Sequence, residues 1–106
     1  MYLHYSDDSD QLAGRGHMKN GLEHGMYEFF WENENIMFRG SMFEGKRIGL
    51  EEEFYDNGNL ERVGSFDNNS QKLGLWKYFN EDGTLEKKEC WEKDKAVDMS
   101  FCKGQE

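Results

Sequence analysis

Three adjacent glutamates form the longest uninterrupted run of carboxylates in this 106-residue sequence: Glu51, Glu52 and Glu53. Paired carboxylates are the groups that general acid–base catalysis uses. On a strand, however, successive side chains point to opposite faces, so Glu51 and Glu53 share one face and Glu52 takes the other. Carboxylates are so frequent in the chain that choosing two of them as an acid and a base is arbitrary. We therefore interpret the run as a solvated or partner-facing strand.

The other residue types with catalytic or metal-binding chemistry lack the necessary spacing. His4, His17 and His24 share no metal-ligand spacing with one another or with the cysteines, and His24 is expected to be exposed in a turn. The stretch "DDSDQL" at 7–12 begins like a calcium loop but lacks the glycine at the sixth position and the acid at the twelfth. Neither a P-loop nor a G-x-S-x-G motif occurs. The sequence predicts no catalytic, cofactor-binding or metal-binding residue, and therefore no enzyme.

Two cysteines, Cys90 and Cys102, bear on the compartment. The first ten residues lack the basic and apolar regions of a signal peptide, and no apolar run approaches the ~18 residues of a membrane span. We therefore expect a cytoplasmic protein, in a bacterial cell or a phage-infected host, with two free thiols. A disulfide or a metal site is the alternative for this pair.

The charge balance restricts the partners. The chain has 22 acidic and 13 basic residues, a net charge of -9, and residues 1–60 hold 12 of the acids but only 5 of the bases. Nucleic acid would be repelled by this surface, whereas a basic protein surface is its electrostatic complement.

The elements that position these residues follow from an internal repeat. Glycines recur with a step of 24 residues, which one inserted residue in "NNSQKLG" lengthens to 25 before the third unit. Apolar residues keep the same step at the end of one expected strand and at the start of the next. The aligned sets are Gly16, Gly40 and Gly64; Gly25, Gly49 and Gly74; Phe30, Phe54 and Phe79; and Ile36, Leu60 and Leu85.

Each unit is predicted to be a β-hairpin, since apolar and polar residues alternate with a period of two and glycine interrupts any helical pattern. "YDNG" is the recurring turn, and Asn57-Gly58 suits a turn with positive φ at both central residues. The recurring glycine in each long strand leaves room for aromatic rings from neighbouring strands. The predicted fold is all-β: an antiparallel meander of tandem ~24-residue hairpins in one twisted sheet. The single domain 1–106 divides into a partial unit 5–15, repeats 16–39, 40–63 and 64–88, and a partial fourth unit 89–103.

The stretches "GKRIGLEEEFYDNGNLERVG" and "LGLWKYFNEDGTLEKKE" resemble MORN repeats (membrane occupation and recognition nexus), in particular the divergent bacterial variety with units close to G-x-W-x-Y-Y-x-x-N-G-x-L. In the first unit "WENENI" lacks the turn glycine, and in the fourth Glu89 replaces a glycine. Proteins similar to this one include antitoxin-like partners of bacterial toxins, scaffolds and proposed lipid binders. The resemblance therefore implies an interaction protein.

Two-residue alternation predicts a stripe of aromatic and acidic side chains along one face of the sheet. Such a stripe is either the packing face of the sheet itself or a set of partner-binding anchors with a charged rim. Glu51 and Glu53, taken as exposed, would project roughly 6–7 Å apart and imitate neighbouring phosphates of a nucleic acid. The candidate partner-binding residues are Tyr27, Phe29, Trp31, Glu51, Glu53, Tyr55, Trp76 and Tyr78.

From these observations we expect a non-catalytic, acidic protein-binding module. It would neutralise one protein, as an antitoxin or a phage-type inhibitor of a bacterial nuclease or defence enzyme, by covering a basic or nucleic-acid-binding surface. The alternatives are a scaffold that oligomerises through open sheet edges, and lipid binding, against which the net charge argues.

Overall fold

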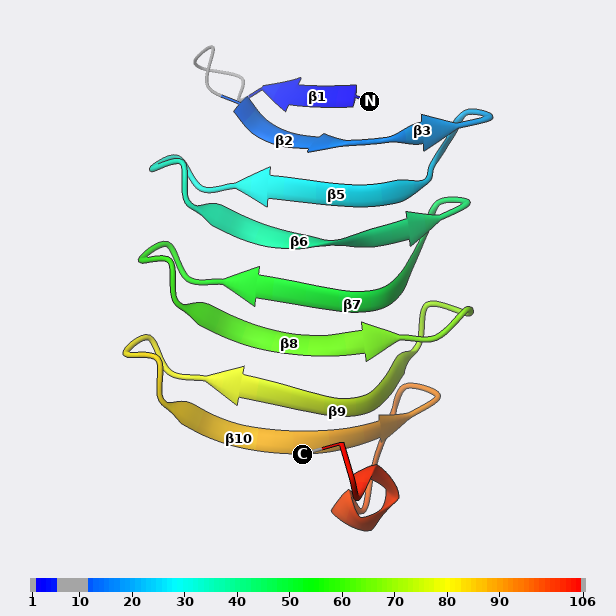
Figure 1. The fold of residues 1–106 in the computed structure, drawn as a ribbon, viewed down its shortest axis with the longest axis vertical. Helices are drawn as coiled ribbons and strands as arrows, with labels where there is room; N and C mark the ends of the chain where they lie inside the picture. Colours follow the sequence, from blue (N-terminus) through cyan, green and yellow to red (C-terminus); the bar gives the residue numbers. More distant parts are fainter. Residues whose placement is uncertain (1, 6–11, 106) are drawn as a thin grey trace.

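The protein is a single curved layer of antiparallel strands. The computed structural model describes residues 2–5 and 12–105. Nine strands form one sheet in the order β1-β2-β5-β6-β7-β8-β9-β10-β11, and β3 and β4 form a separate ribbon at its side (Figure 1). The molecule measures 47 × 37 × 18 Å. The elements are β1 Tyr2–Tyr5, β2 Leu12–Gly16, β3 Met18–Lys19, β4 Leu22–Glu23, β5 Gly25–Phe30, β6 Ile36–Phe43, β7 Lys46–Phe54, β8 Leu60–Phe66, β9 Lys72–Phe79, β10 Leu85–Glu92, β11 Lys95–Val97 and the 3₁₀ turn η1 Met99–Cys102.

The predicted meander of hairpins is confirmed. Strands β5, β7 and β9 end at the aligned phenylalanines, and β6, β8 and β10 begin at the aligned aliphatic residues. Among the described residues the one helical element is the four-residue η1. The borders of the repeat units stay a prediction, and the expected partial unit 5–15 lies partly outside the described residues, as does the stretch "DDSDQL".

Glycines in strands β6 and β8 leave space for aromatic rings from the neighbouring strands, as predicted. Tyr27 of β5 lies over Gly40, where an added Cβ would come within 3.0 Å of its hydroxyl. Trp76 of β9 lies so close to Gly64 that a Cβ there would clash with the indole. Tyr27 and Trp76 are 3% and 1% exposed. A single sheet thereby buries large rings against its own backbone, each covering roughly 150–250 Å².

The second set of recurring glycines forms bulges. Between β6 and β7 the pairing moves from Arg39↔Glu52 to Ser41↔Ile48, so β7 has two more residues than its partner at this point. Gly49 lies in this bulge with φ +67°, and Gly74 occupies the equivalent bulge of β9 with φ +78°. These are left-handed conformations, which glycine adopts without a Cβ penalty.

The hairpin turns lie in two rows, one at each end of the strands, and the two rows differ in geometry and charge. We call the turns at 31–35, 55–59 and 80–84 the acidic edge, because they contain five acidic and no basic residues. The opposite turns, at 19–23, 43–47, 67–72 and 92–95, form the mixed edge, with five acidic and six basic residues. The acidic edge lies on the left in Figure 1 and the mixed edge on the right.

The expectation of positive φ at both Asn57 and Gly58 was wrong. Gly58 has φ +91°, whereas Asn57 is not among the residues with positive φ. The Gly58 N–H donates to the Tyr55 carbonyl, and the Tyr55 N–H donates to Asn59. This is a type I turn followed by a left-handed residue, a three-residue loop. Turns with two positive φ values occur instead on the mixed edge, at Asn20-Gly21 for example.

The expectation of free thiols was also wrong. Cys90 of β10 and Cys102 of η1 form a disulfide with a Cα–Cα distance of 5.8 Å. Cys102 is fully buried, and Asp98 caps η1 by accepting a hydrogen bond from the Ser100 N–H. The sequence could not show this because the pairing depends on the chain folding back over β10 after β11. The disulfide fixes the C-terminal segment on the last hairpin.

Candidate functional site

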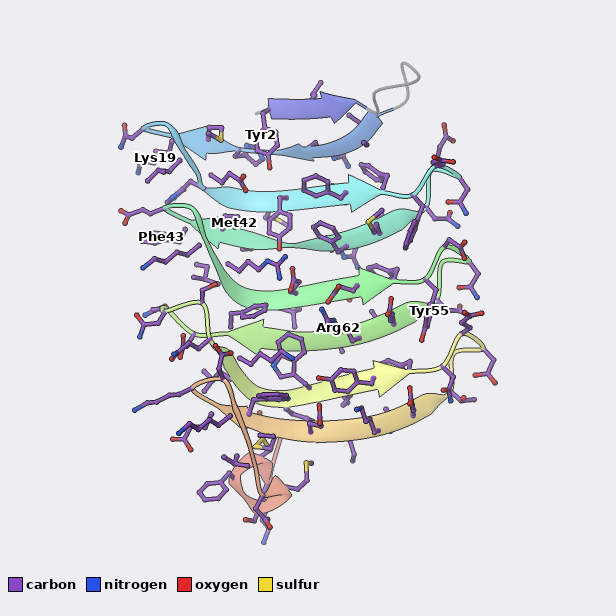
Figure 2. The ribbon with its side chains drawn as sticks, turned by 180° about the vertical axis from the view of Figure 1, so that it is seen from behind. Tyr2, Lys19, Met42, Phe43, Tyr55 and Arg62 are labelled. Atoms are coloured by element: carbon purple, nitrogen blue, oxygen red, sulfur yellow. A yellow bond between two sulfur atoms is a disulfide. The ribbon has the colours of Figure 1, made fainter. Side chains whose placement is uncertain are left out.

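Six of the eight candidate partner-binding residues share one face of the sheet. Pairing places Tyr27 opposite Gly40, Phe29 opposite Phe38, and Glu53 opposite Arg62. We call this side the aromatic face, and it is turned toward the viewer in Figure 2. The six residues are Tyr27, Phe29, Glu51, Glu53, Trp76 and Tyr78. Trp31 and Tyr55 follow the ends of their strands, after a register shift, and belong to the acidic edge.

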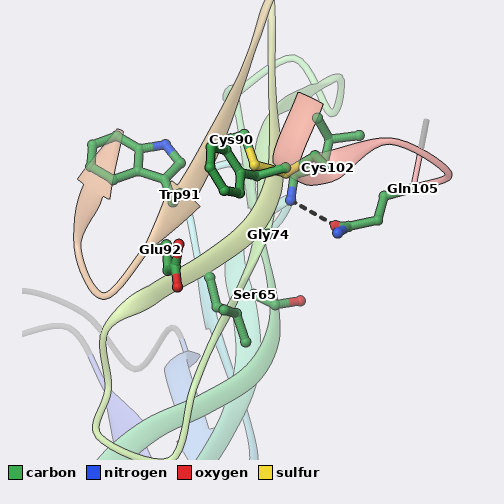
Figure 3. Close-up of a pocket in the computed structure, with 10 residues that line it drawn as sticks. Ser65, Gly74, Cys90, Trp91, Glu92, Cys102 and Gln105 are labelled. Carbon is green, nitrogen blue, oxygen red and sulfur yellow. Dashed lines mark hydrogen bonds between the residues drawn. A yellow bond between two sulfur atoms is a disulfide. The ribbon is translucent and has the colours of Figure 1, made fainter. Parts of the chain in front are cut away.

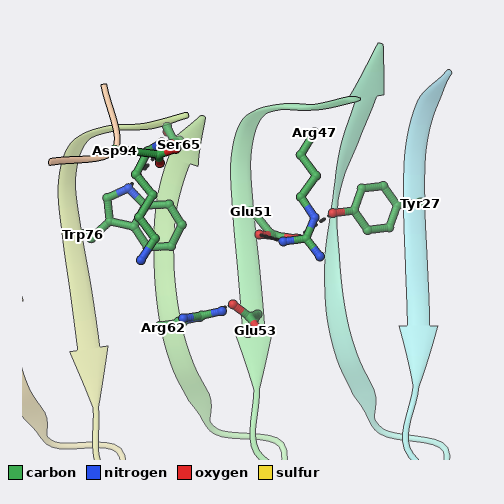
Figure 4. Close-up of polar contacts among 9 residues, drawn as sticks. Tyr27, Arg47, Glu51, Glu53, Arg62, Ser65, Trp76 and Asp94 are labelled. Carbon is green, nitrogen blue, oxygen red and sulfur yellow. Dashed lines mark hydrogen bonds and ion pairs between the residues drawn. The ribbon is translucent and has the colours of Figure 1, made fainter. Parts of the chain in front are cut away.

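Glu51 is buried in the sheet, at 4% exposure, and was wrongly taken as an exposed charge. The Tyr27 hydroxyl donates a 2.6 Å hydrogen bond to its Oε1, and Arg47 lies 3.6 Å from its Oε2 (Figure 4). Burial, followed by the hydrogen bond to Glu51, raises the pKa of Tyr27 well above that of an exposed tyrosine. Glu51 therefore links two repeat units, and replacing it with Lys would place an uncompensated charge inside the sheet.

Glu53 is half-buried and also paired within the sheet. Its carboxylate forms an ion pair with Arg62, which lies beside Tyr78 in the register of β8 and β9. Burial, together with a hydrogen bond to Glu89, raises the pKa of Tyr78 to about 12. Because Glu51 and Glu53 both pair with arginines of the same chain, the structure does not offer them as an unmatched pair of negative charges. Imitation of phosphates by Glu51 and Glu53 is thus unsupported.

Trp76 has a structural place. Its indole N–H donates to the Ser65 carbonyl at 3.2 Å (Figure 4). Its ring meets that of Phe66 edge-on, with 5.3 Å between the ring centroids. The Lys72 ammonium lies 4.9 Å from the ring centroid. Tyr27 and Trp76 are therefore packing residues of the aromatic face, while Phe29 and Tyr78 keep part of their surface exposed. Whether any of the eight residues binds a partner stays a prediction.

Trp31 and Tyr55 connect successive repeats along the acidic edge. The Trp31 indole N–H donates to the Phe54 carbonyl at 3.1 Å, and the Tyr55 hydroxyl donates to the Phe79 carbonyl at 2.7 Å. In each case the acceptor is the last residue of a strand in the next unit, directly before the equivalent turn. These contacts position the turns one above another.

Asparagines form a second set of connections, which sequence reasoning missed. The side-chain amides of Asn33 and Asn35 both donate to the Asp56 carbonyl, at 2.6 and 2.8 Å. Those of Asn57 and Asn59 both donate to the Glu81 carbonyl, at 2.9 and 2.8 Å. We call this arrangement the asparagine ladder. The spacing N-x-N, repeated after 24 residues, was the available signal.

The ladder ends at the third unit. Asp82 and Thr84 occupy the places of Asn57 and Asn59, and the Asp82 carboxylate instead accepts hydrogen bonds from the Thr84 N–H and hydroxyl. These bonds lower the pKa of Asp82. A carboxylate cannot donate to a further turn, so the third hairpin terminates the series on this edge.

The described residues show no arrangement suited to metal chemistry. No three His, Cys, Asp or Glu side chains in ranges 2–5 and 12–105 gather as a metal site. His24, expected to be exposed, is half-buried with its ring 5.1 Å from that of Phe43. The described segments contain no helix long and apolar enough to cross a membrane.

Comparison with known families agrees with this geometry. The family described as MORN repeat variant matches residues 47–68 and 72–93. The first range corresponds to the β7–β8 hairpin and the second to the β9–β10 hairpin. Residues 47–68 and 72–93 are therefore MORN repeats. No curated protein sequence matches the chain. MORN repeats are generally non-enzymatic and are typical of binding or scaffold modules, so this MORN-repeat protein is a repeat-based module with an open sheet.

Proposed function

We propose that this MORN-repeat protein binds one protein partner through its acidic surface and thereby covers a basic, nucleic-acid-binding or catalytic surface of that partner. The proposed partner class is a bacterial nuclease or defence enzyme, which the MORN protein would neutralise as an antitoxin or a phage-type inhibitor. The observation that carries the proposal is the separation of charge between the two edges of a single-layer sheet.

The acidic edge presents its charges in register. Asp56 and Glu81 occupy equivalent turn positions in successive hairpins, and their backbone carbonyls accept the asparagine ladder. Hairpins in one sheet repeat at about 9–10 Å, twice the spacing of neighbouring strands. No Lys or Arg lies within the three turns to compensate the carboxylates. Such a row speeds association with a basic surface and raises its salt dependence.

The ion pairs of the sheet contribute little to this field. Arg15 pairs with Glu28 at 2.7 Å, and Arg39 pairs with Glu52 at 2.9 Å, on the face opposite the aromatic one. Those charges are neutralised locally, whereas Asp56 and Glu81 lie in turns that contain no Lys or Arg. The negative electrostatic potential that results from the net charge of -9 is therefore strongest at the acidic edge.

Capture followed by kinetics tests the proposal. The chain is immobilised, exposed to bacterial lysate at low salt, and the retained protein is identified and purified. Its association rate is then measured at two ionic strengths with the unchanged chain and with Asp56→Lys/Glu81→Lys. We expect the variant to associate about tenfold or more slowly at low salt, with a smaller difference at high salt.

The mixed edge supplies a matched control. Glu44→Lys/Glu92→Lys changes the net charge by the same amount, and both positions belong to the mixed edge. We expect a clearly smaller loss of rate for this pair. Equal losses for the two pairs, or a captured partner with an acidic surface, would contradict the role of the acidic edge.

A scaffold is the alternative within the binding class. Strand β1 Tyr2–Tyr5 is the first strand in the order of the sheet, and Leu3 on it is 50% exposed. Sedimentation over a range of concentrations distinguishes the two, because a scaffold assembles with copies of itself. Lipid binding is the lesser alternative and predicts retention on anionic vesicles, which the net charge disfavours.

The compartment is part of the proposal. We propose a cytoplasmic location, although the Cys90–Cys102 disulfide is more typical of oxidising compartments. Alkylation of cellular protein with a thiol reagent before lysis measures the redox state. Fully alkylated cysteines support a reducing compartment, and protected cysteines contradict it.

A further inference from the structure

The face opposite the aromatic one contains the same small site in successive repeats. In the third unit it consists of the bulge glycine Gly74, the following Leu75, and Cys90, which pairs with Leu75 across the strands. In the second unit Gly49, Leu50 and Ser65 are equivalent, and Leu50 pairs with Ser65. We call these the third-unit site and the second-unit site. Both bulges have the same pattern of strand pairing.

The third-unit site is filled by the C-terminal segment of the chain itself. Cys102 is bonded to Cys90, and the Leu75 N–H donates to Oε1 of Gln105 at 3.0 Å (Figure 3). A Cβ added at Gly74 would lie 2.8 Å from that same oxygen. Leu75 is half-buried. A short 3₁₀ turn with a carboxamide acceptor therefore fits this site.

The second-unit site is open. A Cβ added at Gly49 would meet no atom within 4 Å, and Leu50 is 58% exposed. Met26, the equivalent residue in the first unit, is 67% exposed. The backbone geometry that receives Gln105 at Gly74 thus recurs at Gly49, with φ +67° against +78°. An apolar side chain and a bulge backbone are left uncovered.

We propose that the second-unit site docks a short segment of a partner protein with the chemistry of residues 98–105: a 3₁₀ turn with a small apolar side chain and a carboxamide acceptor about three residues later. The small apolar side chain takes the place of Cys102 against Leu50 and Ser65. The carboxamide takes the place of Gln105 over Gly49. The inference rests on the proposed function only for the existence of a protein partner.

A partner segment is a better occupant than a second copy of the chain. The disulfide ties the segment of each copy to its own Cys90, over its own Leu75. A second copy therefore cannot offer this segment while the disulfide is intact.

The test uses a synthetic peptide as the probe. The peptide has the sequence of residues 97–106 with Cys102→Ala, and it is titrated into the isotope-labelled, oxidised full chain. We expect saturable chemical-shift changes in the amide signals of Gly49, Leu50 and Ser65 and in the methyl signals of Leu50. A second peptide that also carries Gln105→Ala lacks the acceptor and is expected to bind about threefold or more weakly.

Variants of the protein complete the design. Leu50→Asp is expected to weaken peptide binding about tenfold, equivalent to 1.4 kcal/mol, because a carboxylate would be covered by an apolar segment. Leu85→Asp is the matched control, since Leu85 is 50% exposed but lies near the acidic edge, and it should bind as the unchanged chain does.

Three results would overturn the inference: no saturable shifts at the second-unit site, shifts confined to another surface, or equal binding by both aspartate variants. A peptide that competes with a concentration-dependent dimer would identify a second copy as the occupant and overturn the choice of a partner. Failure of this test leaves the salt dependence of the acidic edge unaffected, because the peptide and its site are uncharged at the contact. The two proposals can therefore fail separately.

Discussion

The acidic edge and the mixed edge reverse the same strands in different ways. On the acidic edge every described turn is a three-residue loop whose left-handed residue is Glu34, Gly58 or Gly83, with φ +75°, +91° and +92°. On the mixed edge, two-residue turns with two positive φ values occur at 20–21, 44–45 and 93–94. The turn at 67–72 on the mixed edge is longer than the others. Phe66 pairs with Lys72, and inside them Asp67 pairs with Gln71, which leaves a loop of three residues.

The difference shows where the repeat tolerates length changes. The inserted residue that lengthens the period from 24 to 25 lies at 67–71, where a three-residue loop replaces a two-residue one and Ser70 takes a positive φ of +61°. The acidic edge has no such variation, because its side chains donate to the next turn and would lose their acceptors after a shift. Side-chain coupling between units thus keeps the length of one edge constant.

The largest effect is expected from Gly58→Val. A β-branched residue at φ +91° is strained, so we expect the free energy of unfolding to fall by roughly 1–3 kcal/mol. Asp56→Val, in the same turn but not at a positive φ, is the control and should cost less. Chemical denaturation measures both variants. Wild-type stability of Gly58→Val would mean that the acidic edge does not depend on its left-handed residue.

Next in size is the asparagine ladder. Asn57→Ala/Asn59→Ala removes two amide donors to Glu81 and one acceptor within the turn, and we expect a loss of about 1–2 kcal/mol. Asn69→Ala, on the mixed edge, removes an amide without a hydrogen bond to a neighbouring unit and should change stability by less than about 0.5 kcal/mol. Equal losses from both changes would remove the distinction between the edges.

A third prediction is a stabilising change at the left-handed position of an acidic-edge turn. Glu34 occupies the left-handed position that glycine holds in the other two acidic turns. We expect Glu34→Gly to raise the free energy of unfolding by about 0.5–1 kcal/mol, since it relieves an unfavourable φ. Glu32→Gly, two residues before the strained position in the same turn, should not stabilise. Thermal unfolding of the two variants at one pH is the measurement.

The smallest effect is expected from Tyr27→Phe. Tyr27 lies on the aromatic face and in neither row of turns, so this variant is a reference for the changes in both. Because the pKa of Tyr27 is raised in the folded state above its ordinary value of 10.0, its contribution to stability is complete below pH 10 and is lost as the pH rises beyond it. Tyr27→Phe is therefore expected to be less stable at pH 8 but to lose stability less steeply between pH 10 and 11. Parallel curves for both proteins would argue against burial of this hydroxyl beside Glu51.

Sequence reasoning succeeded where the same structural requirement recurs at a fixed step along the sequence. Gly40 and Gly64 marked the places where rings cover the sheet, and the aligned phenylalanines marked the strand ends. It failed where a bulge or register shift changes the face, which moved Trp31 and Tyr55 to the turns. The burial of Glu51 was also missed, because its partner Tyr27 lies 24 residues away, at the equivalent position of the preceding unit, and the sequence does not show that the two side chains meet.

The sequence by itself determined the all-β class, the hairpin period and the excess of negative charge, since these depend on local spacing and composition. The tertiary structure decided which charges face solvent, because burial depends on contacts between residues 24 positions apart. It also decided the pairing of Cys90 with Cys102, the alignment of the turn asparagines, and which of the equivalent bulges is covered. Local preferences repeat with the sequence, whereas coverage by a neighbouring unit or by the C-terminal segment differs from one repeat to the next.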